Sequence, residues 1–512
     1  MNSFIVQIIT NINNVLNSFV WGSFSLFLLL GTGLVCTVST GALQIRYIGH
    51  WWKKTFGSIK DEARVINDAG AISQFRTFCT ALSSTIGTGN IAGVSTAICV
   101  GGPGAVFWMW IAAILGMMIK FSENVLGVYY RRRNPEGAWS GGAMYYLEDG
   151  LGSLKHGKKA GKVLAILFCI FTIMASFGIG NLGQINKITL NIRATFLSDI
   201  DIGSFAGTPL VDIGIGVVLM LFGALIIMGG FRRLAYVSEK VIPFMLVAYI
   251  LGCLVVIIIH APMMPEVFAS IFKLALGSEA ISGGAAGTAV QVAMNTVKSG
   301  LKRGVFSNEA GLGSSVMAHV NTCAREPVKQ GLWGIAEVFL DTMVICTMTA
   351  LVVLSSGVVN LTTGAVLPGT DDTTLVAKTF GNTLGYAGEI FVVIAVTLFA
   401  FTTVMGWSYY GGKVIEYLFG VFWAKVYRVI FVLLITFGAV LESSLVWDIS
   451  DTFNGFMMIP NLIGVLFLTP LVVRITRNYI DRRIKGKNTE PMLSYNRNIQ
   501  EEAARAVKKG AF

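Results

Sequence analysis

The stretch Ser83-Ser-Thr-Ile-Gly-Thr-Gly-Asn90 interrupts an apolar run that extends from about residue 75 to residue 100. An apolar run of this length predicts a membrane-spanning helix. Inside a bilayer the protein itself must satisfy every backbone N–H and C=O group, and two glycines with an asparagine weaken the helix at mid-depth. Such a break is tolerated where it faces a protein-lined cavity, and there its free backbone groups bind ions and small zwitterions. The stretch therefore predicts a binding site.

The composition of the chain indicates that lipid is the solvent for most of its surface. Of the 512 residues, 54% are hydrophobic and only 13% are charged, whereas soluble proteins carry about 25% charged residues. The apolar blocks are roughly 20 residues long, which suits spanning helices and not the alternating segments of about 10 residues found in barrels. We expect an all-α integral membrane protein. Its seven cysteines show no metal-ligand spacing and are expected to be unpaired.

Eleven spans are expected, centred near residues 30, 87, 116, 174, 220, 250, 290, 345, 397, 433 and 464. The first apolar block is too long for the core of a signal peptide, so we expect it to remain as a helix. If the N-terminus lies outside, 34 of the 39 Lys and Arg residues fall on the inner side, as the positive-inside rule requires. We therefore expect an outside N-terminus, a cytoplasmic C-terminus, and a net charge of +11 that reflects orientation and not nucleic-acid binding.

The ten spans after the first divide into two groups of five, and an odd number forces the groups into opposite orientations, as in the inverted repeats of secondary transporters. By this symmetry the first and sixth helices of the fold are both discontinuous. We expect the second break at Ile281-Ser-Gly-Gly-Ala-Ala-Gly-Thr288, although glycine also serves helix packing in membranes. The expected parts are an extra N-terminal helix (1–42), a cytoplasmic interfacial segment (43–71), two repeats (72–260 and 261–476) and a cytoplasmic tail (477–512).

Four blocks of sequence are long enough to indicate a family. They are Ser84-Thr-Ile-Gly-Thr-Gly-Asn-Ile-Ala-Gly93, Gly101-Gly-Pro-Gly-Ala-Val-Phe-Trp-Met-Trp110, Gly142-Ala-Met-Tyr-Tyr-Leu-Glu-Asp-Gly-Leu-Gly152 and Arg303-Gly-Val-Phe-Ser-Asn-Glu-Ala-Gly-Leu-Gly-Ser-Ser315. Together they resemble the alanine/glycine:cation symporter family (sodium:alanine symporters), and the resemblance covers about residues 20–480. It implies a LeuT-type 5+5 inverted repeat of the amino acid-polyamine-organocation superfamily, in a bacterial or archaeal plasma membrane. It also implies import of a small neutral amino acid, such as alanine or glycine, driven by Na⁺ or in some members by H⁺.

The first break suits a zwitterionic amino acid. The carboxylate of such a substrate can lie against the N–H groups of Thr88 and Gly89, where the half-helix resumes. The ammonium group needs acceptors, and the amide oxygens of Asn90 and Gln184 can serve. An interhelical hydrogen bond is the alternative reading for Gln184.

The resemblance also implies a Na⁺ site. In sodium-coupled carriers of this fold, two hydroxyl residues on the eighth helix complete an oxygen cage with carbonyl groups of the broken first helix. Here these are Thr402 and Thr403, and the carbonyls expected to join them are those of Ser83, Ile86 and Phe399. Without the family, threonines in a membrane helix are more often back-bonded to their own helix.

Two further side chains are expected at the substrate. Trp407, one turn beyond Thr403, either caps the apolar end of the substrate or anchors its helix at the interface. Ala285 follows Gly283-Gly284, where family members often carry a bulky aromatic residue. A small residue there leaves room for glutamine or another mid-sized neutral amino acid.

Several acidic residues fall in or beside expected spans, where a buried charge is costly. Glu123 is expected to be structural. Glu337 and Asp341 are four residues apart and share a helical face, and they either relay protons or hold the structure. Glu309 is expected to cap or latch an inner gate and not to bind substrate.

Other classes of protein fit less well. The four histidines are dispersed and no His-Glu-x-x-His motif occurs, so we expect no catalytic residues, and Na⁺ as coupling ion in place of a cofactor. A channel is the second alternative, but channels usually build a pore between subunits or from rings of like residues. Here the breaks lie within one chain, and a monomer is sufficient.

Overall fold

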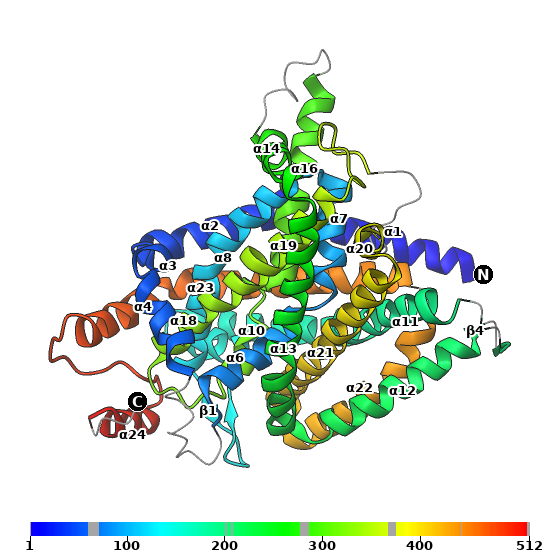
Figure 1. Ribbon diagram of the computed structural model, residues 1–512. Coiled ribbons are helices and arrows are strands. Elements are labelled where there is room, and N and C mark those ends of the chain that lie inside the picture. The colour runs from blue at the N-terminus through cyan, green and yellow to red at the C-terminus, as the bar shows by residue number, and fades with distance from the viewer. Residues whose placement is uncertain are drawn as a thin grey trace.

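The computed structural model describes residues 2–59, 71–198, 200, 202–205, 208–276, 286–366, 375–441 and 443–508. This part of the chain is a bundle of helices (Figure 1). Two short antiparallel hairpins join them, made of β1 (Arg132–Arg133) with β2 (Trp139–Ser140) and of β3 (Ser204–Phe205) with β4 (Thr208–Pro209).

Nine helical stretches of the described residues are long and apolar enough to cross a membrane. Each contains one of the centres expected from the sequence, and only those near residues 87 and 290 fall elsewhere. The count of eleven stays a prediction. The nine stretches are formed by α1 (Asn2–Val20) with α2 (Ser23–Ser39), α8 (Gly104–Tyr129), α10 (Gly157–Phe177) with η4 (Gly178–Leu182) and α11 (Gly183–Phe196), α12 (Leu210–Ile227), α13 (Gly230–Ile259), α18 (Pro327–Val338) with η6 (Phe339–Cys346) and α19 (Thr347–Ser355), α21 (Tyr386–Phe419), α22 (Val421–Val440) and α23 (Ser443–Arg483).

Shorter helices connect these spans. In the segment expected at the interface, Trp51 is buried and Trp52 is half exposed, as in a helix that lies on a membrane surface. The short helices are α3 (Leu43–Arg46), α4 (Ile48–Lys54), η1 (Phe56–Ser58), α9 (Ala143–Tyr145), η3 (Tyr146–Leu151), η5 (Ala261–Met263), α14 (Met264–Leu276), α17 (Val316–His319), α20 (Leu375–Leu384) and α24 (Arg497–Lys508).

The interruption predicted at residues 83–90 is present. Helix α6 (Gln74–Thr85) ends there, η2 (Thr88–Asn90) forms a single turn, and α7 (Ala92–Gly101) continues the span. A β-carbon on Gly87 would lie 2.4 Å from Thr403 Oγ1 of α21. Glycine is therefore what lets the break approach α21 so closely.

The second break predicted from the sequence, at residues 281–288, stays a prediction, because residues 281–285 lie outside the described residues. The described residues contain another interruption, which was not predicted. Helix α16 (Ala286–Asn308) already includes the end of the expected break, and the chain leaves this helix only at Glu309. Positive φ angles of 54° at Glu309, 93° at Gly311 and 70° at Gly313 carry the irregular path to α17. Ala285 lies outside the described residues, and at about 1.5 Å per residue the start of α16 is about 30 Å from Phe306.

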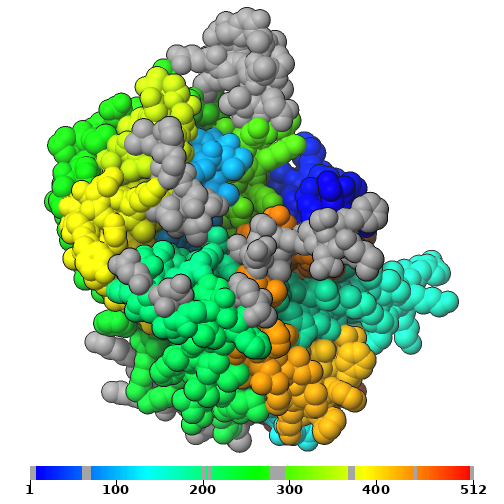
Figure 2. Space-filling model, turned by 90° about the vertical axis from the view of Figure 1, so that its right-hand side faces the viewer, coloured from blue at the N-terminus to red at the C-terminus, as the bar shows by residue number. Residues whose placement is uncertain are grey.

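The two interrupted helices lie inside the bundle. α16 packs along α7 and α8, α18 packs along α8, and α21 packs along α6 and α11. On one outer face α12, in green, lies beside α22, in orange (Figure 2). Val218, Leu221 and Phe222 of α12 are each more than half exposed, an apolar surface that suits contact with lipid.

Three cations are placed differently from the sequence expectation. Lys298, Lys302 and Arg303 were assigned to an inner loop but belong to α16. Lys120, expected near the inner end of its helix, is fully buried. With the three α16 residues moved, 31 of the 39 Lys and Arg residues remain on the expected inner side, so the bias keeps its direction.

Candidate functional site

A small cavity with a volume of about 20 Å³ lies beside the first break. Four of the predicted binding residues, Gly89, Gln184, Thr403 and Trp407, line its wall. The complete lining is Ser84, Thr85, Gly87, Gly89, Ile179, Gln184, Phe306, Glu309, Thr403, Trp407 and Asn454.

Neutral oxygen atoms gather where α21 meets the break. Thr403 Oγ1 is 3.2 Å from the carbonyl oxygen of Ile86 and 3.0 Å from that of Phe399. Thr402 Oγ1 is 2.9 Å from the same Phe399 oxygen. Oxygen ligands are what hard cations prefer, so the structure brings together four of the five residues predicted to bind Na⁺.

The backbone of the break has unused hydrogen-bonding capacity. The Gly87 N–H donates to Asn90 Oδ1 at 3.0 Å, so it does not continue the helical ladder to the carbonyl of Ser83, the fifth predicted Na⁺ ligand. The Thr88 N–H makes only a long contact of 3.5 Å with Gln184 Oε1. The Thr88 hydroxyl is buried and has no hydrogen-bond partner among the described residues. Buried polar groups left unpaired are costly, and a polar ligand would relieve that cost.

Glu309 brings a carboxylate to the cavity wall. Its Oε1 accepts a hydrogen bond of 3.1 Å from Trp407 Nε1, and its Oε2 accepts one from the Ser314 hydroxyl. The residue was expected at an inner gate. Because α16 ends at Asn308, its side chain instead lines the cavity, where the ionised carboxylate would favour a cation beside it.

The Asn90 amide is used to brace the structure. Its Nδ2 donates to Asp341 Oδ1 at 2.6 Å, and its Oδ1 accepts the Gly87 N–H. Ser307, near the end of α16, donates to Asp341 Oδ2 at 2.8 Å. Asp341 on η6 therefore ties the first break to the end of α16, and both ends of the Asn90 amide are occupied by protein groups.

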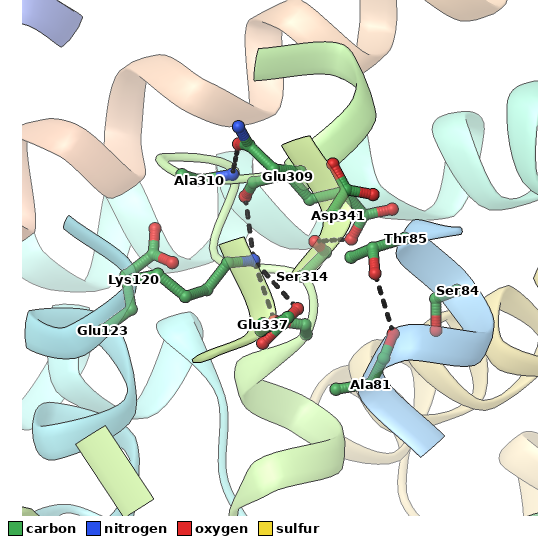
Figure 3. A network of polar contacts seen from close by, with 12 residues as sticks. Ala81, Ser84, Thr85, Lys120, Glu123, Glu309, Ala310, Ser314, Glu337 and Asp341 are labelled. Atoms are coloured by element: carbon green, nitrogen blue, oxygen red, sulfur yellow. Dashed lines mark hydrogen bonds and ion pairs between the residues drawn. The ribbon is translucent and has the colours of Figure 1, made fainter. Parts of the chain in front are cut away.

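Lys120 reaches from α8 into the second irregular segment (Figure 3). Its Nζ lies 3.5 Å from Glu337 Oε1, 2.8 Å from Ser315 Oγ and 3.2 Å from the main-chain oxygen of Glu309. Glu337 also contacts His319 Nε2 at 2.8 Å. A buried charge compensated by partners on several sides fits a structural role.

Glu123 also contacts the irregular segment that follows α16. Its Oε1 accepts the N–H groups of Gly311 and Gly313, both at 3.1 Å, and the Asn461 amide at 2.5 Å. These contacts fix the two glycines whose positive φ angles shape the segment, in line with the structural role expected for Glu123.

An ion pair and a pair of aromatic rings lie next to the cavity-lining residues Phe306 and Asn454. Lys302, one turn before Phe306 on α16, pairs with Asp451 of α23 at 2.5 Å. The Phe306 and Trp447 rings pack with centroids 6.1 Å apart. Lys302 precedes Phe306 on α16, and Asp451 precedes Asn454 on α23. The ion pair therefore lies on the side of the cavity that faces the N-terminal ends of both helices.

The sequence model of the sodium:alanine symporter family matches residues 6–493. The chain belongs to this family. One relative is the sodium/alanine symporter AgcS of Methanococcus maripaludis. It is 41% identical to this chain, over 93% of this chain and 98% of its own length. The probable sodium/glutamine symporter GlnT of Bacillus subtilis is 34% identical and covers 94% of this chain and 93% of its own. The amino-acid carrier protein AlsT of the same organism is 33% identical, with coverages of 92% and 92%.

A solved structure supports the fold assigned to this sodium:alanine symporter family member. MhsT in complex with L-phenylalanine has a TM-score of 0.50 at 14% identity, over 80% of this chain and 98% of that chain. At this identity the likeness concerns the fold alone, and it agrees with the helical transporter architecture expected from the sequence.

Several cavity residues of this symporter family member were not among the predicted binding residues. Phe306 and Glu309 stand in the block Arg303-Gly-Val-Phe-Ser-Asn-Glu309, which served only to indicate the family. Asn454 is a polar residue in an apolar span, a signal of function that the sequence reading passed over. The others are Ser84, Thr85, Gly87 and Ile179. The first three belong to the interrupted stretch 83–90, and Ile179 directly precedes Gly180-Asn-Leu-Gly-Gln184.

Proposed function

We propose that this protein imports a small neutral amino acid together with Na⁺ by alternating access. The observation that supports the proposal is that Thr403 belongs both to the predicted Na⁺ site and to the wall of the cavity. Its hydroxyl lies among the neutral oxygens of Ile86 and Phe399 and also lines the cavity of the broken helix.

The groups in and around the cavity offer a partner for each part of a zwitterionic amino acid, although the cavity as it stands, about 20 Å³, must widen to admit one. The carboxylate lies against the Thr88 N–H and hydroxyl and the Gly89 N–H, at the start of the resumed half-helix. The ammonium group lies against Glu309, with the Gln184 amide oxygen as a further acceptor. The apolar rings of Phe306 and Trp407 surround a short side chain. Asn90 braces the break behind these groups, and Ala285 is left out because the helix that follows it begins far from the cavity.

Na⁺ binds between the carbonyl oxygens of Ser83, Ile86 and Phe399 and the hydroxyls of Thr402 and Thr403. These ligands are neutral, which suits an ion that must be released in every cycle. The distribution of Lys and Arg residues supports an outside N-terminus and a cytoplasmic tail, so that the Lys302–Asp451 ion pair faces outward.

Uptake into proteoliposomes tests this function. Purified protein is reconstituted, and labelled alanine uptake is measured with a Na⁺ gradient alone, an H⁺ gradient alone and neither. Uptake driven by Na⁺ alone is expected, together with acceleration by preloaded unlabelled alanine, which a channel does not show. Uptake that ignores both gradients would contradict the proposal, and uptake driven by H⁺ alone would assign a different coupling ion.

Glutamine is a second candidate substrate because of Asn454. Its side chain is 2% exposed, its Oδ1 has no hydrogen-bond partner among the described residues, and it lines the cavity. This oxygen suits the amide N–H of a glutamine side chain, and the relative GlnT is named as a probable sodium/glutamine symporter. Asn454→Ala is expected to lower glutamine uptake about tenfold, the effect of losing one good hydrogen bond, with little change for glycine. An unchanged ratio of glutamine to glycine uptake would exclude this role.

A further inference from the structure

A second, larger cavity lies where α2 ends and α23 runs on into the tail. Its volume is about 410 Å³, and it is separate from the substrate cavity. It is lined by Val38, Ser39, Thr40, Gly41, Arg46, Tyr47, Val473, Thr476, Arg477, Ile480, Asp481, Lys485 and Lys487.

The charges around this cavity are mainly positive. Lys485 and Lys487 both contact Asp481, at 3.1 Å and 3.3 Å. The guanidinium groups of Arg46 and Arg477 form no salt bridge or hydrogen bond with any described residue. Four cations against one carboxylate leave a net charge of +3, so the cavity suits an anion.

Apolar residues continue from the cavity into the span. Val38 is 70% exposed, and Leu34, one turn deeper on α2, is 56% exposed. Pro470, one turn deeper than Val473 on α23, is also exposed. The two helices stay packed between these points, where Cys36 Sγ lies 3.7 Å from Thr469 Oγ1. A free phosphate would leave this apolar strip unused, whereas an acyl chain would cover it.

We propose that this cavity binds an anionic phospholipid, with its phosphate between Arg46 and Arg477 and one acyl chain along Leu34, Val38 and Pro470. Basic pockets at the cytoplasmic ends of membrane helices attract such headgroups. In the orientation proposed above the cavity lies at the inner leaflet. The site does not depend on which substrate is carried, and binding is measured without transport.

The test compares lipids with identical acyl chains. The detergent-solubilised full-length protein is mixed with phosphatidylglycerol, phosphatidylcholine or inorganic phosphate, and bound lipid is counted by native mass spectrometry. We expect phosphatidylglycerol to remain bound, phosphatidylcholine to bind much more weakly, and inorganic phosphate not to displace the lipid. Equal retention of the two lipids, or displacement by inorganic phosphate, would overturn the proposal.

Variants separate this cavity from general surface charge. Arg46→Gln with Arg477→Gln is expected to weaken phosphatidylglycerol binding about thirtyfold, because each cation near a membrane surface contributes about 1 kcal/mol, or about fivefold. The control is Lys155→Gln with Lys158→Gln, which removes the same charge from two exposed positions at the start of α10. If both double variants lose the lipid equally, the binding is only surface electrostatics and the proposal fails.

Val38→Trp tests the acyl-chain contact without changing any charge. The larger side chain narrows the cavity mouth and is expected to reduce phosphatidylglycerol binding. Melting temperatures of all variants, measured without added lipid, establish that they are folded. A folded Val38→Trp variant that binds the lipid as the wild type does would rule out the proposed path of the chain.

Discussion

In the proposed Na⁺ site Thr402 is a ligand, and its hydroxyl, which donates to the Phe399 carbonyl in this structure, does not line the substrate cavity. Thr402→Ala is therefore expected to raise the Na⁺ concentration for half-maximal uptake about tenfold, since a contact with a charged group is worth about 1.5–3 kcal/mol. The KM for the amino acid at saturating Na⁺ should stay close to that of the wild type. The control is Thr397→Ala on the same helix, whose hydroxyl has no hydrogen-bond partner among the described residues. Identical Na⁺ dependence in the two variants would remove Thr402 from the site.

Glu309 is the cavity residue whose charge matters most to the proposed binding mode. Glu309→Gln keeps the shape of the side chain and an acceptor for Trp407 Nε1, but it removes the negative charge that faces the ammonium group. The KM for alanine is expected to rise at least about tenfold, in line with the cost of removing one partner of a buried charge pair. Glu148→Gln serves as control, because Glu148 pairs with Lys162 at 2.7 Å outside the cavity lining. A wild-type KM in the Glu309 variant would show that the ammonium group lies elsewhere.

At the scale of elements, the contact between the broken helix and α21 depends on the missing β-carbon of Gly87. In Gly87→Ala the new methyl group would overlap Thr403 Oγ1, so either the Thr403 hydroxyl must turn away from the Ile86 carbonyl or the break and α21 must separate. Na⁺-driven uptake should fall to background while the protein still reaches the membrane. Gly93→Ala is the matched control, since no atom lies within 4 Å of the added carbon. Comparable uptake by both variants would mean that the close approach has no role in transport.

The two interruptions show what the sequence could and could not predict. The break at Gly87–Asn90 was predictable because polar and glycine residues at mid-span conflict with the bilayer. The break at Glu309–Ser315 was missed because it depends on backbone angles, including a positive φ at Glu309, and the sequence contains a richer glycine run elsewhere. Ile179 reaches the cavity through packing of distant helices, which local sequence does not record, whereas Asn454 is a polar residue in an apolar span and could have been singled out.

At the scale of the whole molecule, Glu326 joins the start of α18 to the end of α23. Its carboxylate contacts Arg482 and Arg483, each at 2.7 Å. Burial alone would raise the pKa of Glu326, but the hydrogen bonds and charges of the two arginines outweigh it and hold the pKa below the ordinary glutamate value. The contact therefore stabilises the folded state above the unfolded-state pKa of about 4.3, and the stabilisation is lost as the pH falls through the folded-state pKa.

This linkage predicts a pH-dependent difference in thermal stability. At pH 7 Glu326→Gln should melt several degrees below the wild type in detergent. The difference should shrink as the pH is lowered from 5 towards the folded-state pKa. Glu136→Gln removes a half-exposed partner of Lys425 and is expected to change the melting temperature little at any pH. A constant gap between wild type and Glu326→Gln across this range would refute the assignment.

The position of Thr403 has a thermodynamic consequence. A residue that serves ion and amino acid at once makes each ligand part of the binding environment of the other. By reciprocity, the factor by which Na⁺ increases amino-acid affinity must equal the factor by which the amino acid increases Na⁺ affinity. Titration calorimetry of Na⁺ with the amino acid present, and of the amino acid with Na⁺ present, should therefore give the same coupling free energy. Thr403→Val should lower this coupling free energy in both titrations. In a carrier with this property each ligand binds weakly without the other, so Na⁺ seldom crosses the membrane uncoupled from the amino acid.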